Sequence, residues 1–104
     1  MTPSEKLYTE IGSSLNGVEL SQMFGKPALK INGKAFACFF KECMAFKITG
    51  EEHAKALGLK KSKLFDPSGA NRPMKEWVQV TFDHKDQWPA FAKEAMAYVK
   101  KSSK

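Results

Sequence analysis

The fold of this chain is decided by residues 30–48, "KINGKAFACFFKECMAFKI". The Asn32-Gly33 step between two apolar runs predicts a tight hairpin, because a type I′ turn needs positive φ at both central residues. Lys41-Glu42 marks a second two-residue turn between apolar runs. The period-two pattern predicts strands near 18–24, 27–31, 34–40 and 43–48, the first two either separate or one long strand bent at Gly25.

Pairing the last two of these strands gives a sheet with two apolar faces. One face carries Ala35, Ala37, Phe39, Met44, Phe46 and Ile48, and the other carries Phe36, Cys38, Phe40, Cys43, Ala45 and Lys47. A small sheet with one wet side would show one polar face. The alanines leave room for a helix on the first face, so we expect another helix or a partner chain to cover the second.

Helices and further strands surround this hairpin. Leu7, Ile11 and Leu15 form one stripe of a helix over residues 3–16. Thr49 with Glu52 three residues on is typical of a capping box. The other predicted elements are a helix at 50–57, an extended piece at 63–66, a strand at 76–82 and a helix from Asp86, which places Pro89 in the tolerant first turn.

Length and composition indicate one compact domain. A chain of 104 residues with 42% apolar residues can build a single core. Its apolar runs are all far shorter than the roughly 20 residues that span a bilayer. The N-terminal "MTPSEKLYTE" has no apolar stretch typical of a secretory signal, so we expect a cytoplasmic protein. Residues 100–104 are expected to form a flexible basic tail.

The residues most often used in catalysis are scattered. Cys38 and Cys43 lie in apolar surroundings at a spacing that does not suit a metal site. His53 and His84 are far apart, and neither has a nucleophile or a paired carboxylate at a suitable spacing. No glycine-rich loop precedes a helix, so a phosphate cradle is not expected. The sequence predicts no enzyme, no metal, no cofactor and no small-molecule substrate.

Positive charge is concentrated in two places. The net charge is +6, and the basic clusters are Lys60, Lys61 and Lys63, and Lys100, Lys101 and Lys104. Clustered lysines raise encounter rates with anions such as nucleic acid. Clustered lysines are also the commonest way to keep a small protein in solution, and the sequence favours this second interpretation.

Four stretches carry a resemblance to a known family: "MFGKPALKINGKAFACFF", "AFKITGEEHAKAL", "RPMKEWVQV" and "WPAFAKEAMAYV". From about Leu15 to Val99 the chain resembles the N-terminal domain of the TfoX (Sxy) competence-regulator family and its free-standing relatives, which are related to the YjbR-like group. The resemblance implies an α+β fold with an antiparallel sheet flanked by helices, in the order α-β-β-β-α-β-β-α, also likened to secretion chaperones. It implies no catalytic residues. Full-length members have a second domain without a counterpart here, so regulation that needs it is not expected.

The connection "LFDPSGANRPMKEWVQV", residues 64–80, holds the candidate binding residues. Arg72 and Lys75 precede a strand whose wet face would begin with Trp77, and Lys47 is expected on a neighbouring strand. Cations beside an aromatic are typical of surfaces that bind single-stranded nucleic acid. The alternative is that Trp77 packs under the N-terminal helix and the cations are only solvated.

Two functional hypotheses follow. The first is a non-enzymatic interaction module of the TfoX N-terminal type, which contacts a protein partner or forms a homodimer in a regulatory context through the second apolar face. The alternative is low-specificity nucleic-acid binding through basic residues and an exposed aromatic. Neither hypothesis involves a membrane.

Overall fold

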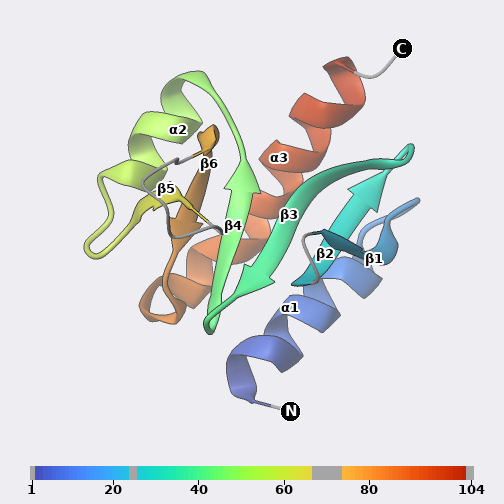
Figure 1. The fold of residues 1–104 in the computed structure, drawn as a ribbon, viewed down its shortest axis with the longest axis horizontal. Coiled ribbons are helices and arrows are strands. Elements are labelled where there is room, and N and C mark those ends of the chain that lie inside the picture. Colours follow the sequence, from blue (N-terminus) through green and yellow to red (C-terminus); the bar gives the residue numbers. More distant parts are fainter. Residues whose placement is uncertain (1, 24–25, 67–73, 103–104) are drawn as a thin grey trace.

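The computed structural model describes residues 2–23, 26–66 and 74–102, and it confirms the α+β class (Figure 1). Three α-helices accompany a six-stranded sheet of order β1-β2-β3-β4-β6-β5, in which all neighbours are antiparallel. The elements are α1 (Pro3–Ser14), β1 (Glu19–Met23), β2 (Lys26–Ile31), β3 (Lys34–Phe40), β4 (Cys43–Lys47), α2 (Gly50–Leu57), β5 (Lys63–Phe65), β6 (Met74–Val80), the 3-10 helix η1 (Phe82–Gln87) and α3 (Trp88–Ser102). Their order follows the expected one, with residues 18–31 forming a hairpin of two strands.

Both predicted tight turns are present. Asn32 and Gly33 have φ of 53° and 78°, so β2 and β3 are joined through the left-handed conformations that the Asn-Gly step favours. Lys41 and Glu42 also have positive φ, of 47° and 65°, although neither is glycine. The register of β3 with β4 runs from Phe40 opposite Cys43 to Ala37 opposite Phe46, as the sequence predicts.

A bulge in β3 changes the predicted faces. Leu29 pairs with Ala37 but Lys30 pairs with Ala35, so the register shifts and Phe36 is the extra residue. A shift of one residue turns the preceding side chains to the opposite face. Phe36 therefore belongs to the main core and Ala35 to the other face, and the sequence prediction for these two residues was wrong.

The main core lies between the sheet and the helices. We call this side of the sheet the helix-covered face. In Figure 1, α1 and α3 run behind the sheet and α2 lies at its upper left. Ala92 and Ala95 on α3 are fully buried, as expected for a helix that docks closely. Phe46 meets Phe91 with ring centroids 5.7 Å apart. The Trp88 indole Nε1–H donates to the carbonyl oxygen of Thr81 at 3.2 Å.

Helix α1 presents a different stripe from the predicted one. Its buried residues include Tyr8, Ile11 and Gly12, whereas Leu7 is only partly buried. A Cβ on Gly12 would lie 2.6 Å from the Leu29 side chain. Glycine at this position therefore lets α1 approach the sheet more closely than alanine would allow.

The other helix boundaries refine the predictions. Thr49 is the N-cap of α2, but its side chain makes no capping hydrogen bond, so the predicted capping box is not formed. Helix α3 begins at Trp88 rather than Asp86, after the 3-10 helix, and Pro89 is its second residue. It continues through Ser102, so residues 100–102 are helical where a flexible tail was expected. None of the described helices has the length and apolar character needed to cross a bilayer.

Candidate functional site

The second side of the sheet carries none of the described helices, and we call it the helix-free face (Figure 1). It is built from small side chains and aromatic rings: buried Ala28, Cys38, Ala45, Phe65 and Trp77, with partly buried Ala35 and Phe40 beside them. Cys38 is 1% exposed and Trp77 is 5% exposed. The second apolar face thus exists, but most of it is already buried in a single copy of the chain.

The structure brings two of the predicted binding residues together. Lys47 on β4 pairs directly with Trp77 on β6. Trp77 is buried, with its ring centroid 5.9 Å from that of Phe65, so it was wrongly expected on a wet face. It also lies on the side of the sheet opposite α1, so packing under the N-terminal helix is not observed either. Arg72 and the side chain of Lys75 lie outside the described residues.

Lysines surround the helix-free face. Because side chains alternate along a strand, Lys26 and Lys30 share this face with Ala28, and Lys47 shares it with Ala45. Lys63 joins them, since it pairs with Gln79, which also pairs with Ala45. We call Lys26, Lys30, Lys41, Lys47 and Lys63 the basic set. Within the described part of the chain, none of these ammonium groups forms an ion pair.

Phe40 is the accessible aromatic ring of this face. It is partly buried, and the Nζ atoms of Lys26 and Lys41 lie 4.8 Å and 5.3 Å from its centroid. Phe65 packs edge-on against it at 5.4 Å. The sequence did not single out Phe40 or Lys26 as binding residues. Strand alternation was the available signal, because it already placed Phe40 on the second face.

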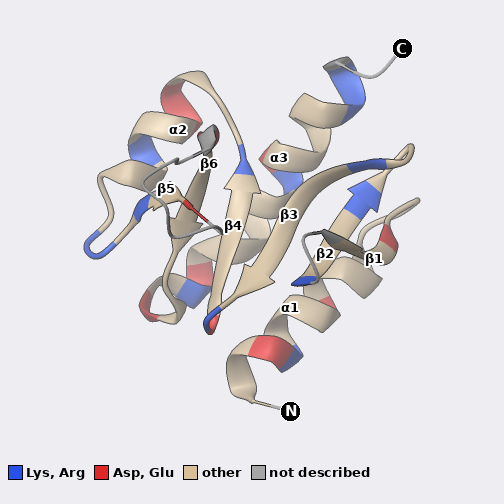
Figure 2. Cartoon of the chain, viewed as in Figure 1, with Lys and Arg blue, Asp and Glu red and all other residues tan. Residues whose placement is uncertain are grey.

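Negative charge lies mostly on the other side of the molecule. On the helix-free face Glu19 is opposite Lys30, and Asp66 directly follows β5. Glu76 on β6 accepts from Tyr98 of α3, and Glu42 in the β3–β4 turn accepts from Ser4 of α1. Figure 2 shows blue positions at the ends of β2 and β4 and also on the helices, and red positions on the helices, on the turns and at β5 and β6. The carboxylates of the helical layer are Glu5, Glu10, Glu51, Glu52, Asp83, Asp86 and Glu94. The helix-free face is therefore the more basic side.

The two thiols are poorly suited to nucleophilic chemistry. Burial raises the pKa of Cys38 to about 12. Burial also raises the pKa of Cys43, whose Sγ donates to the carbonyl oxygen of Lys41 at 3.5 Å. Since the thiolate is the reactive form, both side chains remain protonated and unreactive at neutral pH.

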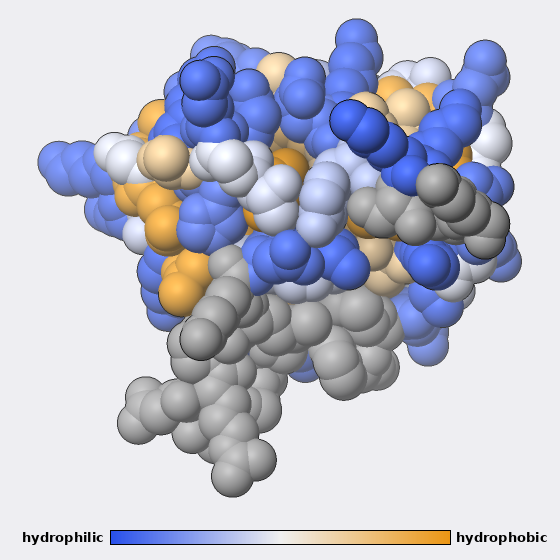
Figure 3. Space-filling view, turned by 90° about the horizontal axis from the view of Figure 1, so that it is seen from above, coloured by the Kyte–Doolittle hydropathy of each residue, from blue (hydrophilic) through white to orange (hydrophobic). Residues whose placement is uncertain are grey.

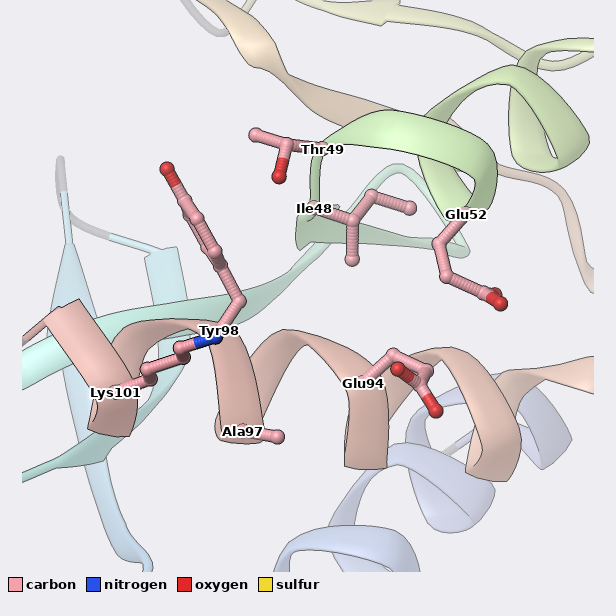
Figure 4. A pocket seen from close by; sticks show the side chains of 7 residues that line it. All are labelled: Ile48, Thr49, Glu52, Glu94, Ala97, Tyr98 and Lys101. Atoms are coloured by element: carbon pink, nitrogen blue, oxygen red, sulfur yellow. The ribbon is translucent and has the colours of Figure 1, made fainter.

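An open pocket of about 260 Å³ lies between α2 and α3 (Figure 4). Glu52 extends from α2 toward α3, and Glu94 rises from α3 on the other side of the gap. Tyr98 lies in the same pocket, and its hydroxyl donates to Glu76 Oε2 at 2.9 Å, which raises the pKa of the phenol. Among the described contacts, no hydrogen bond orients Glu52 or Glu94.

His84, one of the two described histidines, makes a structural contact. Its Nε2 donates to the carbonyl oxygen of Lys60 at 2.8 Å, which ties η1 to the segment after α2. Lys61 and Asp83 form an exposed ion pair at 3.6 Å in the same region. Within residues 2–23, 26–66 and 74–102, no group of three His, Cys, Asp or Glu side chains could hold a metal ion.

Comparison of the chain with protein-family models, with curated proteins and with solved structures found no match in any of the three.

Proposed function

We propose that this protein is a non-enzymatic binding module, of the type represented by the TfoX N-terminal domain, whose helix-free face binds single-stranded nucleic acid. The observation that carries the proposal is the basic set, which surrounds a half-buried phenylalanine on a sheet face that is free of described helices. Single-strand binding combines a basic surface that follows the phosphates with aromatic rings on which bases stack.

The charge distribution supports this proposal. The lysines of the basic set are not ion-paired to described residues, so they remain available to phosphates. Glu19 opposes Lys30 and offsets part of the charge, which leaves capacity for about four phosphates. In the unbound chain the ammonium groups of Lys26 and Lys41 lie over the Phe40 ring. We therefore expect both side chains to swing aside when a base stacks on the ring, and to bind the phosphates next to that base.

Contact with a protein partner is the second candidate, and it stays a prediction. The hypothesis of a protein partner required an exposed apolar face. Ala28, Cys38 and Ala45 on the helix-free face are at most 1% exposed, so they offer little apolar surface to a partner. The surface seen in Figure 3 is mostly hydrophilic, with separate smaller apolar areas. The most exposed large apolar side chain in the described part is Leu20, which is 53% exposed and lies on an edge strand rather than on this face.

Titration of the protein with a fluorescent oligothymidine at several salt concentrations tests the proposal. With about four phosphates neutralised on a single strand, the affinity falls roughly 50-fold between 50 and 200 mM salt. Polyglutamate of matched charge is the control, because it offers the charge without bases to stack. Absence of oligonucleotide binding at 50 mM salt, or equal affinity for polyglutamate, would contradict nucleic-acid binding.

A further inference from the structure

The two edges of the sheet are protected to different degrees. The edge strand β5 has only three residues, begins with Lys63, and pairs irregularly with β6 between Leu64 and Phe65. Short, charged and irregular edges resist pairing with another chain. The opposite edge strand, β1, has five residues, pairs regularly with β2, and contains neither lysine nor proline. Its one charged residue is Glu19 at the first position, so residues 20–23 lack the usual protection.

Pro27 determines which backbone groups of β1 point outward. Gln22 pairs with Pro27, and proline has no N–H to exchange, so this is a non-hydrogen-bonded pair. The two kinds of pair alternate, so Leu20 and Leu29 form the same kind. The N–H and C=O groups of Leu20 and Gln22 consequently point away from β2. In the described part of the chain no hydrogen-bond partner takes them.

We propose that β1 pairs with β1 of a second copy of this chain, antiparallel, about a twofold axis at Ser21. In this register Leu20 lies opposite Gln22 of the second copy, and the outward N–H and C=O groups of both residues are satisfied. Glu19 lies opposite Met23 of the second copy. The two Glu19 carboxylates are then held about 14 Å apart along the strands, so like charges do not meet.

The sequence of β1 is suited to pairing with a second copy of β1 in this register. A twofold axis at Ser21 uses all five residues of the strand. An axis at Leu20 would place Gln22 opposite Val18, which precedes the strand, so hydrogen bonds would be lost. Pairing by the same patch on both copies is the usual geometry of a homodimer. The exposed Leu20 side chain, which lies against Gly12 of α1, would be covered by the second copy.

Pairing at this edge extends the sheet through both copies. It places Lys26 and Lys30 of each copy in the strand next to the interface, on the same face. The two helix-free faces then form one continuous basic surface. The pairing itself rests on the edge strand alone and does not depend on the proposed nucleic-acid binding.

Sedimentation analysis of the full chain over a range of concentrations tests the dimer. We expect a reversible equilibrium between the 11.6 kDa monomer and a dimer. Gln22→Pro removes an N–H that faces outward and leaves the ladder with β2 intact, so it raises the dimer dissociation constant at least 10-fold while the circular dichroism spectrum is retained. Leu20→Lys acts in the same direction. Leu57→Lys, at a 36% exposed leucine on α2, is the matched control and leaves the dimer unchanged.

Oxidative cross-linking tests the register. Ser21→Cys places two thiols in a non-hydrogen-bonded pair with Cα atoms about 4.5 Å apart, within disulfide range. Glu19→Cys is the control, because its two copies are too distant. A monomer at every concentration up to about 1 mM, or a dimer that cross-links equally through both variants, would overturn the proposal. Oligonucleotide binding by a monomeric Gln22→Pro variant separates this result from the proposed function.

Discussion

The two faces of the sheet are built from different side chains. The helix-covered face contains large residues such as Phe36, Phe46 and Met44, all fully buried under the helices. The helix-free face contains small residues such as Ala28 and Ala45, with aromatic rings at one end and lysines around it. Buried apolar area scales with side-chain size, so most of the stability comes from the first face. The second face retains the charge that is available for binding.

The largest expected difference between the faces is in stability. Phe46→Ala removes a fully buried ring that packs against Phe91, so we expect it to lower the free energy of unfolding by about 3–5 kcal/mol. Phe40→Ala on the helix-free face removes a half-buried ring, and we expect a loss of about 1–2 kcal/mol. Urea denaturation monitored by circular dichroism measures both. Equal losses would contradict the assignment of stability to the helix-covered face.

The buried thiol of Cys38 makes the stability of the fold depend on pH in the alkaline range. Burial raises the pKa of Cys38 from 9.0 to about 12 in the folded chain. Below pH 9 the thiol is mostly protonated in both the folded and the unfolded chain, so it does not make the free energy of unfolding depend on pH. As pH rises above 9 the unfolded thiol loses its proton first, so we expect the free energy of unfolding to fall by about 1.4 kcal/mol per pH unit.

Cys38→Ala is the matched variant for this measurement. It removes the Cys38 contribution and makes the slope above pH 9 shallower. A residual slope remains because burial also raises the pKa of Cys43 and of Tyr8. Urea denaturation between pH 8 and 10 gives the slope. The assignment of the slope to Cys38 fails if the variant and the natural chain show the same dependence.

Substitution of two aromatic residues on the helix-free face distinguishes a ring that stacks on bases from a ring that only packs in the core. We expect Phe40→Leu to lower oligonucleotide affinity about 10-fold, because it removes the accessible ring. Trp77→Phe keeps the affinity within about 2-fold, because Trp77 is buried and contributes packing. Fluorescence anisotropy at one fixed salt concentration compares the two. If Trp77→Phe lowers oligonucleotide affinity more than Phe40→Leu does, then Trp77 and not Phe40 is the ring on which bases stack.

The smallest expected effect is that of a single lysine. Lys47→Gln should lower oligonucleotide affinity about 5-fold at 50 mM salt and reduce the slope of log affinity against log salt by about 0.7. Lys93→Gln is the matched control, since Lys93 is exposed on α3 in the helical layer. Salt titrations of both variants measure the slopes. Equal losses of affinity in the two variants would mean that oligonucleotide binding depends on the total charge and not on the helix-free face.

Much of the fold could be predicted because its signals are local. The Asn32-Gly33 turn joins β2 to β3, and the Lys41-Glu42 turn sets the register of β3 with β4. The alternation along these strands gives both faces their apolar character. The bulge at Phe36 could not be predicted, because it depends on pairing with β2 and not on the residue itself. Because of the bulge, Phe36 and Ala35 lie on the faces opposite to those predicted.

The candidate site was predicted less well for the same reason. Lys47 was placed correctly beside Trp77, since both belong to strands with clear alternation. The burial of Trp77 depends on Phe65, which reaches it from a separate edge strand. Phe40 gains its cations from Lys26 and Lys41, and the Lys26 contact joins residues that are distant in sequence. Contacts of this kind have no local signal.

Nuclear magnetic resonance mapping of the bound oligonucleotide tests the central claim most directly. Addition of an oligothymidine to the isotope-labelled chain at 50 mM salt should shift the amide signals of the helix-free face, at Lys26, Phe40 and Lys47, and leave those of α1 and α3 in place. Shifts confined to the helical layer, or no shifts at saturating oligonucleotide, would contradict the claim that the lysine-rich side of the sheet is the binding surface.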